Sequence, residues 1–258
     1  MKFCRFALRN DASSVSYGIV EDDAVREITS APWTSWSRGH RSWGLADIRF
    51  LAPVEPRKIV CVGRNFAAHA AELGNEVPKE PLIFLKPSSS IIGPGEPIIL
   101  PRYSQRVEHE GELALIVGRR CSHLADTEDA LSYLTGYSCL NDVTARDLQK
   151  SDGQFTRAKG FDTFCPIGPW IESELDPSNL TLETSVNRER RQFSSTSLML
   201  HSPAALVRWI SRMMTLDPGD VIATGTPAGV GPLLDGDLVE VSIERIGVLR
   251  NPVHAPSA

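Results

Sequence analysis

The sequence lacks the long runs of lysine and arginine that are typical of nucleic-acid-binding proteins. Its 258 residues include 27 lysines and arginines and 32 aspartates and glutamates, so the net charge is −5 with neutral histidines. The basic residues are dispersed and form no stripe. We therefore expect no nucleic acid partner.

Long apolar segments are also absent near the start of the chain. Lys2, Arg5 and Arg9 already interrupt the first ten residues, which predicts neither a signal peptide nor a membrane anchor. The five cysteines are scattered, odd in number and form no C-x-x-C pair. This pattern indicates reduced thiols in a cytoplasmic protein rather than a disulfide framework or a zinc site.

Apolar residues are plentiful enough for a buried core, at 41% of the chain. Strand-like runs outnumber helical ones and no repeated βαβ unit is visible, which predicts a strand-rich α+β fold. We expect a small N-terminal β domain in residues 1–50 and a larger domain in residues 51–258. Residues 30–44, rich in Trp, Ser and Arg, are predicted to be a loop. The expected strands of the larger domain are 58–63, 82–86, 97–100, 112–118, 134–142, 180–186, 220–224 and 238–244.

Three short helices are expected from their boundary residues. One runs from Asn65 as N-cap to Gly74 just beyond its C-terminus. A second begins with Thr144 as N-cap, followed by an acidic variant of the capping box. The third begins with Ser202 as N-cap and Pro203 at the first helical position, and it has apolar residues at helical spacing.

Two glutamates stand at the start of an expected strand in VEHEGELALIVG, residues 107–118. Glu110 and Glu112 are two residues apart, so they project from the same face of a strand. Two carboxylates about 4 Å apart repel by roughly 4 kcal/mol at an effective dielectric of 20, so a proton or a cation must lie between them. With Asp142, at the end of another expected strand, they would form an oxygen-only site suited to Mg²⁺, Mn²⁺ or Ca²⁺. The alternatives are a solvated strand edge and a turn at Asn141–Asp142.

His69 and Glu72 lie three residues apart on the first expected helix, and hence on one face. A carboxylate beside an imidazole fixes its tautomer and raises its basicity, which suits a general base. The alternative is an ordinary pair on a helix surface. The preceding GRNF segment joins a strand to a helix, where functional loops often lie.

Two further segments have residues that bind anions in other proteins. Residues 224–231, TGTPAGVG, follow an expected strand and offer backbone N–H groups and hydroxyls, although G-K-[ST] is missing and a P-loop is excluded. A plain Gly/Pro turn is the alternative. Lys159 lies in a mixed apolar and Gly/Pro setting, where it faces either an anion or solvent.

Six segments in sequence order resemble the signatures of the fumarylacetoacetate hydrolase family. They are VGRNFAAHAAELG, PLIFLKPSSSIIGPG, VEHEGELALIVG, GYSCLNDVTARDLQ, RAKGFDTFCPIGP and LDPGDVIATGTPAGVG. Within the family the chain is similar to the bacterial group of acylpyruvases and 2-hydroxyhepta-2,4-diene-1,7-dioate isomerases, which have a small N-terminal domain. The resemblance implies a mixed β-sandwich roll in a homodimer, with Mg²⁺ or Mn²⁺ in the site and Ca²⁺ as a substitute in crystals.

The resemblance also implies roles for individual residues. Three acids match metal ligands, three residues match catalytic positions and four match substrate-contacting positions. The metal ligands are Glu110, Glu112 and Asp142. The catalytic positions are His69, Glu72 and Lys159. The substrate-contacting positions are Arg64, Gln149, Thr226 and Gly225. Lys86 matches a further family position of lower weight, and His69 and Glu72 match a pair on a mobile lid helix that activates water.

The implied substrate is a small 2-oxo acid or its enol. The implied reaction is hydrolysis of a C–C bond in a 2,4-dioxo acid through a metal-bound enolate. The same enolate also permits decarboxylation or tautomerisation of oxaloacetate, and isomerisation or decarboxylation of 2-hydroxyhepta-2,4-diene-1,7-dioate. A catalytically silent binding protein is a remote alternative. A non-haem Fe(II) oxygenase is not expected, because none of the six histidines forms an H-x-[DE] pair.

Overall fold

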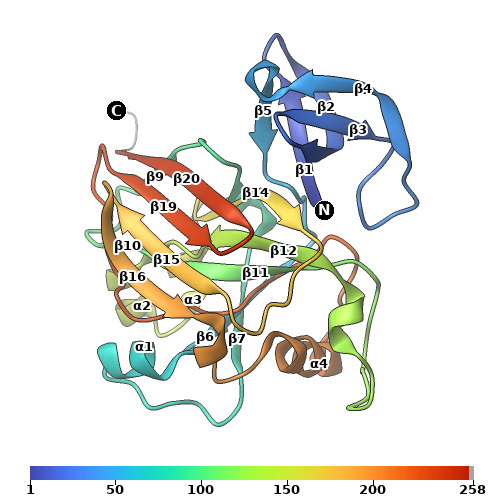
Figure 1. Cartoon of the computed structure of the whole chain (residues 1–258). Helices are drawn as coiled ribbons and strands as arrows, with labels where there is room; N and C mark the ends of the chain where they lie inside the picture. The colour runs from blue at the N-terminus through green and yellow to red at the C-terminus, as the bar shows by residue number, and fades with distance from the viewer. Residues whose placement is uncertain (256–258) are drawn as a thin grey trace.

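Five antiparallel strands form the small N-terminal β unit drawn in blue in Figure 1. The computed structural model describes residues 1–255. The unit's strands are β1 (Lys2–Leu8), β2 (Asp11–Glu21), β3 (Ala24–Ile28), β4 (Arg38–Gly44) and β5 (Ile48–Leu51). β1 also pairs antiparallel with β14 (Cys165–Glu172) of the main body. The N-terminal unit is therefore joined to the main body through one 12-stranded sheet.

The predicted loop at residues 30–44 is wrong for its second half, because residues 38–44 form β4 and pair with β3. This strand is half-buried at most and has no alternating apolar pattern, so the sequence gives no strand signal. In the first half, Trp33 and Trp36 pack edge-on against Tyr17 and Phe3, with ring centroids 5.9 and 5.3 Å apart. The tryptophans thus anchor the connection between β3 and β4 to the core.

The main body continues the large sheet beyond β14 in the order β12, β11, β17, β6 and β7, and β8 pairs with β14. β17 and β6 are parallel, as are β8 and β14, and the other pairs are antiparallel. These strands are β6 (Ile59–Gly63), β7 (Leu82–Lys86), β8 (Ile91–Ile92), β11 (Gly111–Val117), β12 (Leu134–Asn141) and β17 (Val221–Ala223).

A second sheet lies in front of β11 and β12 in Figure 1, with the order β16, β15, β19, β20 and β9. A third, short sheet has the order β13, β10 and β18. The strands of both are β9 (Ile98–Ile99), β10 (Val107–His109), β13 (Thr144–Ala145), β15 (Thr181–Val186), β16 (Glu189–Ser195), β18 (Gly231–Pro232), β19 (Leu238–Ile243) and β20 (Gly247–His254).

Both faces of β11 are buried, which explains its nearly continuous apolar sequence. Leu113 and Leu115 belong to the core shared with Leu182 of the second sheet. Ala114 and Ile116 belong to a separate core on the opposite face. The predicted strand-rich α+β sandwich is therefore confirmed. Its sheets hold the polar residues at the ends of β11 and β12 in fixed positions.

Four α-helices and four 3₁₀ segments complete the described chain. They are α1 (Ala67–Glu72), α2 (Arg146–Asp152), α3 (Phe155–Lys159), α4 (Pro203–Met213), η1 (Leu45–Asp47), η2 (Ser88–Ser90), η3 (Ala130–Tyr133) and η4 (Thr196–Leu198). The predicted start of α4 is confirmed, because Ser202 accepts a hydrogen bond from the Ala205 N–H and Pro203 is the first helical residue. Within residues 1–255, no helix has the length and apolarity needed to cross a membrane.

Two predicted helix caps are wrong. Phe66 takes the N-cap position of α1 without a side-chain hydrogen bond, while Asn65 turns its side chain to distant backbone groups. Thr144 belongs to β13, and Ala145 precedes α2 instead. Long-range pairing therefore overrides the local capping preference at both sites. Gly74 follows the end of α1 with φ +67°, as its predicted place beyond the C-terminus requires.

Candidate metal centre and active site

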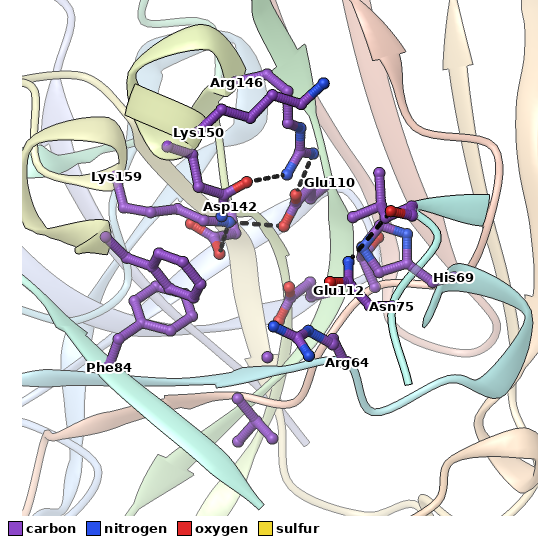
Figure 2. A pocket seen from close by; sticks show the side chains of 16 residues that line it. Arg64, His69, Asn75, Phe84, Glu110, Glu112, Asp142, Arg146, Lys150 and Lys159 are labelled. Atoms are coloured by element: carbon purple, nitrogen blue, oxygen red, sulfur yellow. Dashed lines mark hydrogen bonds and ion pairs between the residues drawn. The ribbon is translucent and has the colours of Figure 1, made fainter. Parts of the chain in front are cut away.

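A cavity of about 190 Å³ opens among the ends of several strands and three helices. Its walls come from the β6–α1 junction, α1, β7, the β10–β11 junction, α2, α3 and the loop after β17 (Figure 2). Eight of the ten predicted site residues line it: Arg64, His69, Glu110, Glu112, Asp142, Gln149, Lys159 and Thr226. The other two do not line it, but each adjoins a lining residue: Glu72 contacts His69, and Gly225 precedes Thr226.

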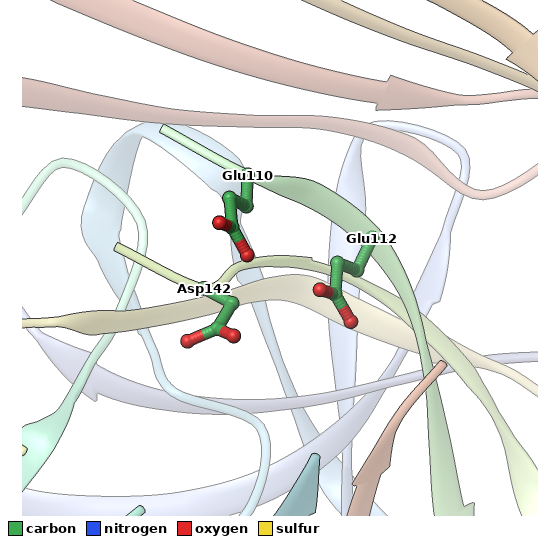
Figure 3. A group of neighbouring side chains, drawn as sticks. All are labelled: Glu110, Glu112 and Asp142. Atoms are coloured by element: carbon green, nitrogen blue, oxygen red, sulfur yellow. The ribbon is translucent and has the colours of Figure 1, made fainter. Parts of the chain in front are cut away.

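The three predicted acidic ligands meet in this cavity (Figure 3). Glu110 lies between β10 and β11, Glu112 lies on β11, and Asp142 follows β12. The Asp142 N–H donates to the Glu110 carbonyl at 2.8 Å, which fixes the two strand ends together. One oxygen of each carboxylate lies within 4.8 Å of the others. Their exposed fractions are only 5%, 2% and 1%, so the alternative of a solvated strand edge is wrong.

Buried cations surround two of these acids. The Lys159 ammonium donates to Glu110 Oε2 at 2.7 Å and to Asp142 Oδ2 at 2.6 Å. Arg146 donates to Glu110 Oε1 at 2.5 Å, and Lys86 donates to Asp142 Oδ1 at 2.6 Å. Burial alone would raise the pKa of Glu110, but the charges of Lys159 and Arg146 outweigh it and hold that pKa well below its usual range. Glu110 is therefore a carboxylate.

Glu112 has a different environment. It accepts a hydrogen bond from the Gly225 N–H at 2.6 Å and forms no ion pair with any lysine, arginine or histidine of residues 1–255. Burial and the neighbouring charges of Asp142 and Glu110 raise its pKa well above the usual range. A divalent cation would relieve this repulsion, and hard cations prefer carboxylate oxygens. The donor set therefore fits Mg²⁺, Mn²⁺ or Ca²⁺.

The predicted pair on α1 is formed. His69 Nδ1 lies 3.1 Å from Glu72 Oε2. Glu72 Oε1 also accepts a hydrogen bond from the Gly229 N–H at 2.9 Å, so the loop after β17 holds the carboxylate. Because His69 is buried and lines the cavity, the alternative of an ordinary surface pair does not describe this histidine. The arrangement can support proton transfer at the cavity wall.

The remaining predicted residues around the cavity differ in whether protein contacts hold their side chains. Arg64 has φ +59°, an uncommon conformation for an arginine, at the junction of β6 and α1. Gln149 accepts a hydrogen bond from Arg146 Nη1 at 2.7 Å. The Thr226 hydroxyl accepts from Gln192 Nε2 at 2.8 Å. Gln149 and Thr226 are thus already fixed by protein contacts, whereas the Arg64 side chain forms no hydrogen bond or ion pair within residues 1–255.

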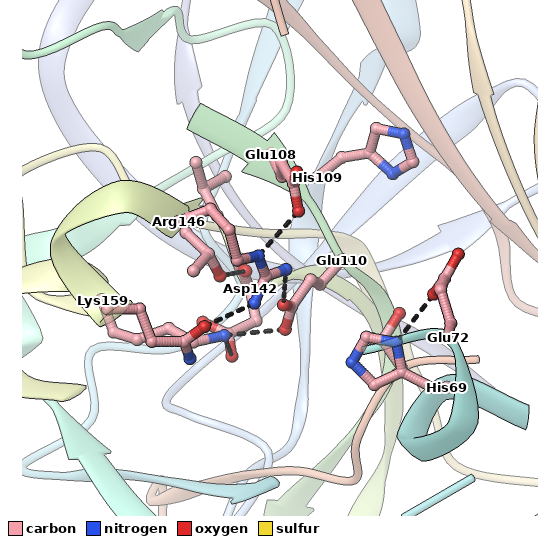
Figure 4. A network of polar contacts seen from close by, with 12 residues as sticks. His69, Glu72, Glu108, His109, Glu110, Asp142, Arg146 and Lys159 are labelled. Carbon is pink, nitrogen blue, oxygen red and sulfur yellow. Dashed lines mark hydrogen bonds and ion pairs between the residues drawn. The ribbon is translucent and has the colours of Figure 1, made fainter. Parts of the chain in front are cut away.

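Two polar residues beside Glu110 are directed elsewhere (Figure 4). Glu108 accepts from Arg146 Nε at 2.7 Å and from Arg106 Nε at 2.6 Å. His109 turns away from Glu110, and its Nδ1 lies 3.3 Å from Gln192 Oε1. Arg146 was not predicted to be a site residue. Its only signal was its place four residues after Asp142 within the NDVTARDLQ segment.

Residues 58–254 match the family model described as Fumarylacetoacetate (FAA) hydrolase C-terminal, which covers more than half of the chain. The chain belongs to the fumarylacetoacetate hydrolase family. The resemblance found in the six sequence segments is therefore confirmed. Residues 1–53 match a second family model, described as Rv2993c-like, N-terminal.

Named relatives in the fumarylacetoacetate hydrolase family differ in reaction. The structure of a 5-carboxymethyl-2-hydroxymuconate delta-isomerase from Mycobacterium smegmatis is 48% identical, with a TM-score of 0.92, and the match covers 99% of this chain and 100% of that one. A mitochondrial oxaloacetate tautomerase from Xenopus laevis is 42% identical over 221 residues, which cover 81% of this chain and 69% of the relative.

A maleylpyruvate hydrolase from Sphingobium sp. SYK-6 has been solved in complex with manganese(II) and pyruvate. It is 31% identical to this chain with a TM-score of 0.81, and the match covers both chains in full. The fumarylacetoacetate hydrolase family thus contains hydrolases, isomerases and tautomerases, and one structural neighbour binds a divalent metal. This chain is an enzyme of that family.

Proposed function

We propose that the protein is a divalent-metal-dependent hydrolase that cleaves a C–C bond of a 2,4-dioxo acid of the acylpyruvate or fumarylpyruvate type. One observation carries this proposal: the buried acids line the same small cavity as His69, which is paired with Glu72. A site that only tautomerises or decarboxylates a 2-oxo acid needs no group that activates water. The histidine–carboxylate pair supplies one.

We assign Glu110, Glu112 and Asp142 as the residues that would hold Mg²⁺ or Mn²⁺. When bound, such an ion supplies Lewis-acid polarisation of substrate oxygens. The protein contributes a rigid frame, because the acids lie at the ends of paired strands and are buried. Lys159 lies between Glu110 and Asp142 and can neutralise anionic oxygens of the substrate at the same place.

The pair on α1 directs the hydrolytic step. Glu72 accepts a hydrogen bond from the Nδ1–H of His69, which leaves Nε2 as the base that removes a proton from water. The resulting hydroxide attacks the C4 carbonyl, and the C3–C4 bond breaks. The acyl part leaves as a carboxylic acid, and C3 takes up a proton to give pyruvate. Arg64, Gln149, Gly225 and Thr226 are the proposed substrate-contacting residues around this reaction path.

A second candidate reaction is tautomerisation or decarboxylation of oxaloacetate, or isomerisation or decarboxylation of 2-hydroxyhepta-2,4-diene-1,7-dioate. The names of the Xenopus and Mycobacterium smegmatis relatives favour it. These reactions use the same acids and Lys159, but they do not need water as a nucleophile. The use of water as a nucleophile therefore separates the two candidates.

A spectrophotometric panel tests the proposal. Acetylpyruvate, fumarylpyruvate, oxaloacetate and the dienedioate are each offered with Mg²⁺, Mn²⁺ or a chelator. We expect metal-dependent cleavage of the two acylpyruvates, with pyruvate and a carboxylic acid as products. Turnover of oxaloacetate or the dienedioate alone would favour the second candidate. No turnover of any 2-oxo acid with either metal would contradict both and favour a binding protein.

We also propose that the enzyme is a cytoplasmic homodimer that acts without nucleic acid or membrane partners. The family resemblance motivates the dimer, and the dispersed basic residues and free cysteines motivate the other features. Sedimentation equilibrium of the purified protein measures the oligomeric state directly. A monomer at micromolar concentration would contradict the dimer.

A further inference from the structure

Gln192 lies outside the cavity, on β16 at the edge of the second sheet, opposite the sheet that carries the acids (Figure 1). Its exposed fraction is 0%. Its amide nitrogen donates to Thr226 Oγ1 and to the Pro227 carbonyl, both at 2.8 Å. Its amide oxygen accepts from the Gly111 N–H at 3.0 Å and lies 3.3 Å from His109 Nδ1. One buried side chain thus contacts two separate segments of the site.

The first segment is the β10–β11 junction. Gly111 stands between Glu110 and Glu112, so a movement of its backbone moves both carboxylates. The second sheet packs directly on this glycine: a Cβ atom there would lie 2.0 Å from Thr184 Oγ1 and 3.3 Å from Gln192 Oε1. The position of this junction is therefore set from the second sheet.

The second segment is the loop after β17. Thr226 follows Gly225, whose N–H donates to Glu112 Oε2. The Thr226 hydroxyl also donates to the Gly111 carbonyl at 2.9 Å, so the loop and the junction are linked to each other as well as to Gln192. A side chain with two N–H donors and an acceptor at one end satisfies both segments together. An apolar side chain there would leave the buried Gly111 N–H without this partner.

We propose that Gln192 is a positioning residue that sets the separation of Glu110 and Glu112 by fastening their junction to the Gly225–Thr226 loop. The inference rests on the proposed metal-binding function of these acids. Gln192 does not line the cavity, so its effect on the acids passes through the residues it contacts, chiefly Gly111 and Thr226. Groups that support metal-ligating residues typically change metal affinity about 10–100-fold when removed.

The test compares Gln192→Met with Thr184→Val by calorimetric titration of the purified full chain with Mn²⁺. Thr184 is a matched control: it faces Gln192 across the strand pair and is equally buried, and its hydroxyl has no hydrogen-bond partner in residues 1–255. We expect Gln192→Met to bind Mn²⁺ at least about 10-fold more weakly and Thr184→Val to bind like the parent. Parental affinity in Gln192→Met, or equal losses in both variants, would overturn the proposal.

Hydrogen exchange of the metal-free proteins gives a second readout. Gln192→Met should accelerate exchange in peptides covering residues 107–117 and 222–231, while Thr184→Val should not. If the parent binds no Mn²⁺, the proposed metal-dependent function fails, and the exchange result alone decides the role of Gln192. Unchanged exchange would then overturn it. Should Gln192→Met not fold, Gln192→Glu keeps the acceptor for Gly111 and removes the amide donors, and the same readouts apply.

Discussion

Gly225 donates its backbone N–H to the Glu112 carboxylate at 2.6 Å, across 113 residues of sequence. Glu112 is buried and has no ion pair within residues 1–255, so this backbone group is its main polar support. Gly225 reaches the position with φ +96°, a conformation that favours glycine. A Cβ atom there would lie 2.7 Å from Asn65 Cβ and 3.1 Å from the Val62 carbonyl oxygen.

Gly225→Ala should therefore destabilise the fold and weaken metal binding. The unfavourable φ costs about 1–2 kcal/mol, and the forced shift of Asn65 adds about 1–3 kcal/mol. Urea unfolding of the metal-free protein measures the sum. Gly236→Ala is the matched control, because Gly236 has φ +86° with no heavy atom within 4 Å of its Cβ position. Equal losses in the two variants would mean that the contact with Asn65 contributes nothing.

His69→Ala should remove acylpyruvate cleavage but retain oxaloacetate decarboxylation. The expected loss in kcat for cleavage is about 10²–10⁴-fold, because a general base is removed. Glu72→Gln should reduce the same rate less, since the imidazole stays but loses its carboxylate partner. Both rates are measured on the same protein preparations with Mg²⁺. Parallel loss of the two activities in His69→Ala would remove water activation from the roles of this pair.

The meeting of Glu110, Glu112 and Asp142 could be predicted from local rules for the two glutamates together with the family resemblance for the full set. Strand periodicity sets the first two on one face, and the third ends a neighbouring strand. Asn65 shows where local rules fail. It has the composition of an N-cap, yet its amide donates to the carbonyls of His201 and Thr224, which lie 136 and 159 residues away. No pattern near Asn65 reveals those partners.

The burial of Arg146 and Lys86 was equally hidden from composition and spacing. Arg146 and Lys86 look like ordinary surface residues, because arginine and lysine are mostly exposed. In the fold they are buried against acids that come from other segments. Gln192 lies on a strand of mostly exposed residues and gave no signal at all. Strand β4 was missed for the related reason that backbone pairing with β3, rather than burial, defines it.

Lys159→Met and Lys86→Met should both destabilise the fold, but only Lys159→Met should also lower kcat strongly. Both lysines are buried and contact Asp142, but only Lys159 lines the cavity. Lys159→Met should lower kcat about 10²–10³-fold, the usual effect of removing one donor to a developing anion. Each substitution leaves at least one buried carboxylate oxygen without its cation and should destabilise the fold by about 3–5 kcal/mol. Steady-state kinetics and urea unfolding, measured on both variants, check the division. A larger kcat loss in Lys86→Met than in Lys159→Met would contradict the catalytic role of Lys159.

Glu112→Gln should stabilise the metal-free protein at neutral pH while abolishing metal binding. Burial, Asp142 and Glu110 raise the pKa of Glu112 in the folded state well above its ordinary value of 4.5. Above about that pH the unfolded chain releases the proton while the folded chain retains it, so stability falls as pH rises. Glu110 acts in the opposite direction. Its lowered pKa stabilises the fold at pH values above the ordinary pKa of a glutamate, and that stability is lost as the pH falls.

The difference between parent and Glu112→Gln isolates the first effect, because Glu110 is present in both. Thermal unfolding between pH 4.5 and pH 8 with chelator should show a parent that loses stability relative to the variant as pH rises. Added Mn²⁺ should raise the Tm of the parent alone, since a ligand stabilises only the state that binds it. Identical pH slopes in the two proteins would mean that Glu112 is ionised in the metal-free fold, and that its repulsion from Asp142 and Glu110 is relieved without a cation.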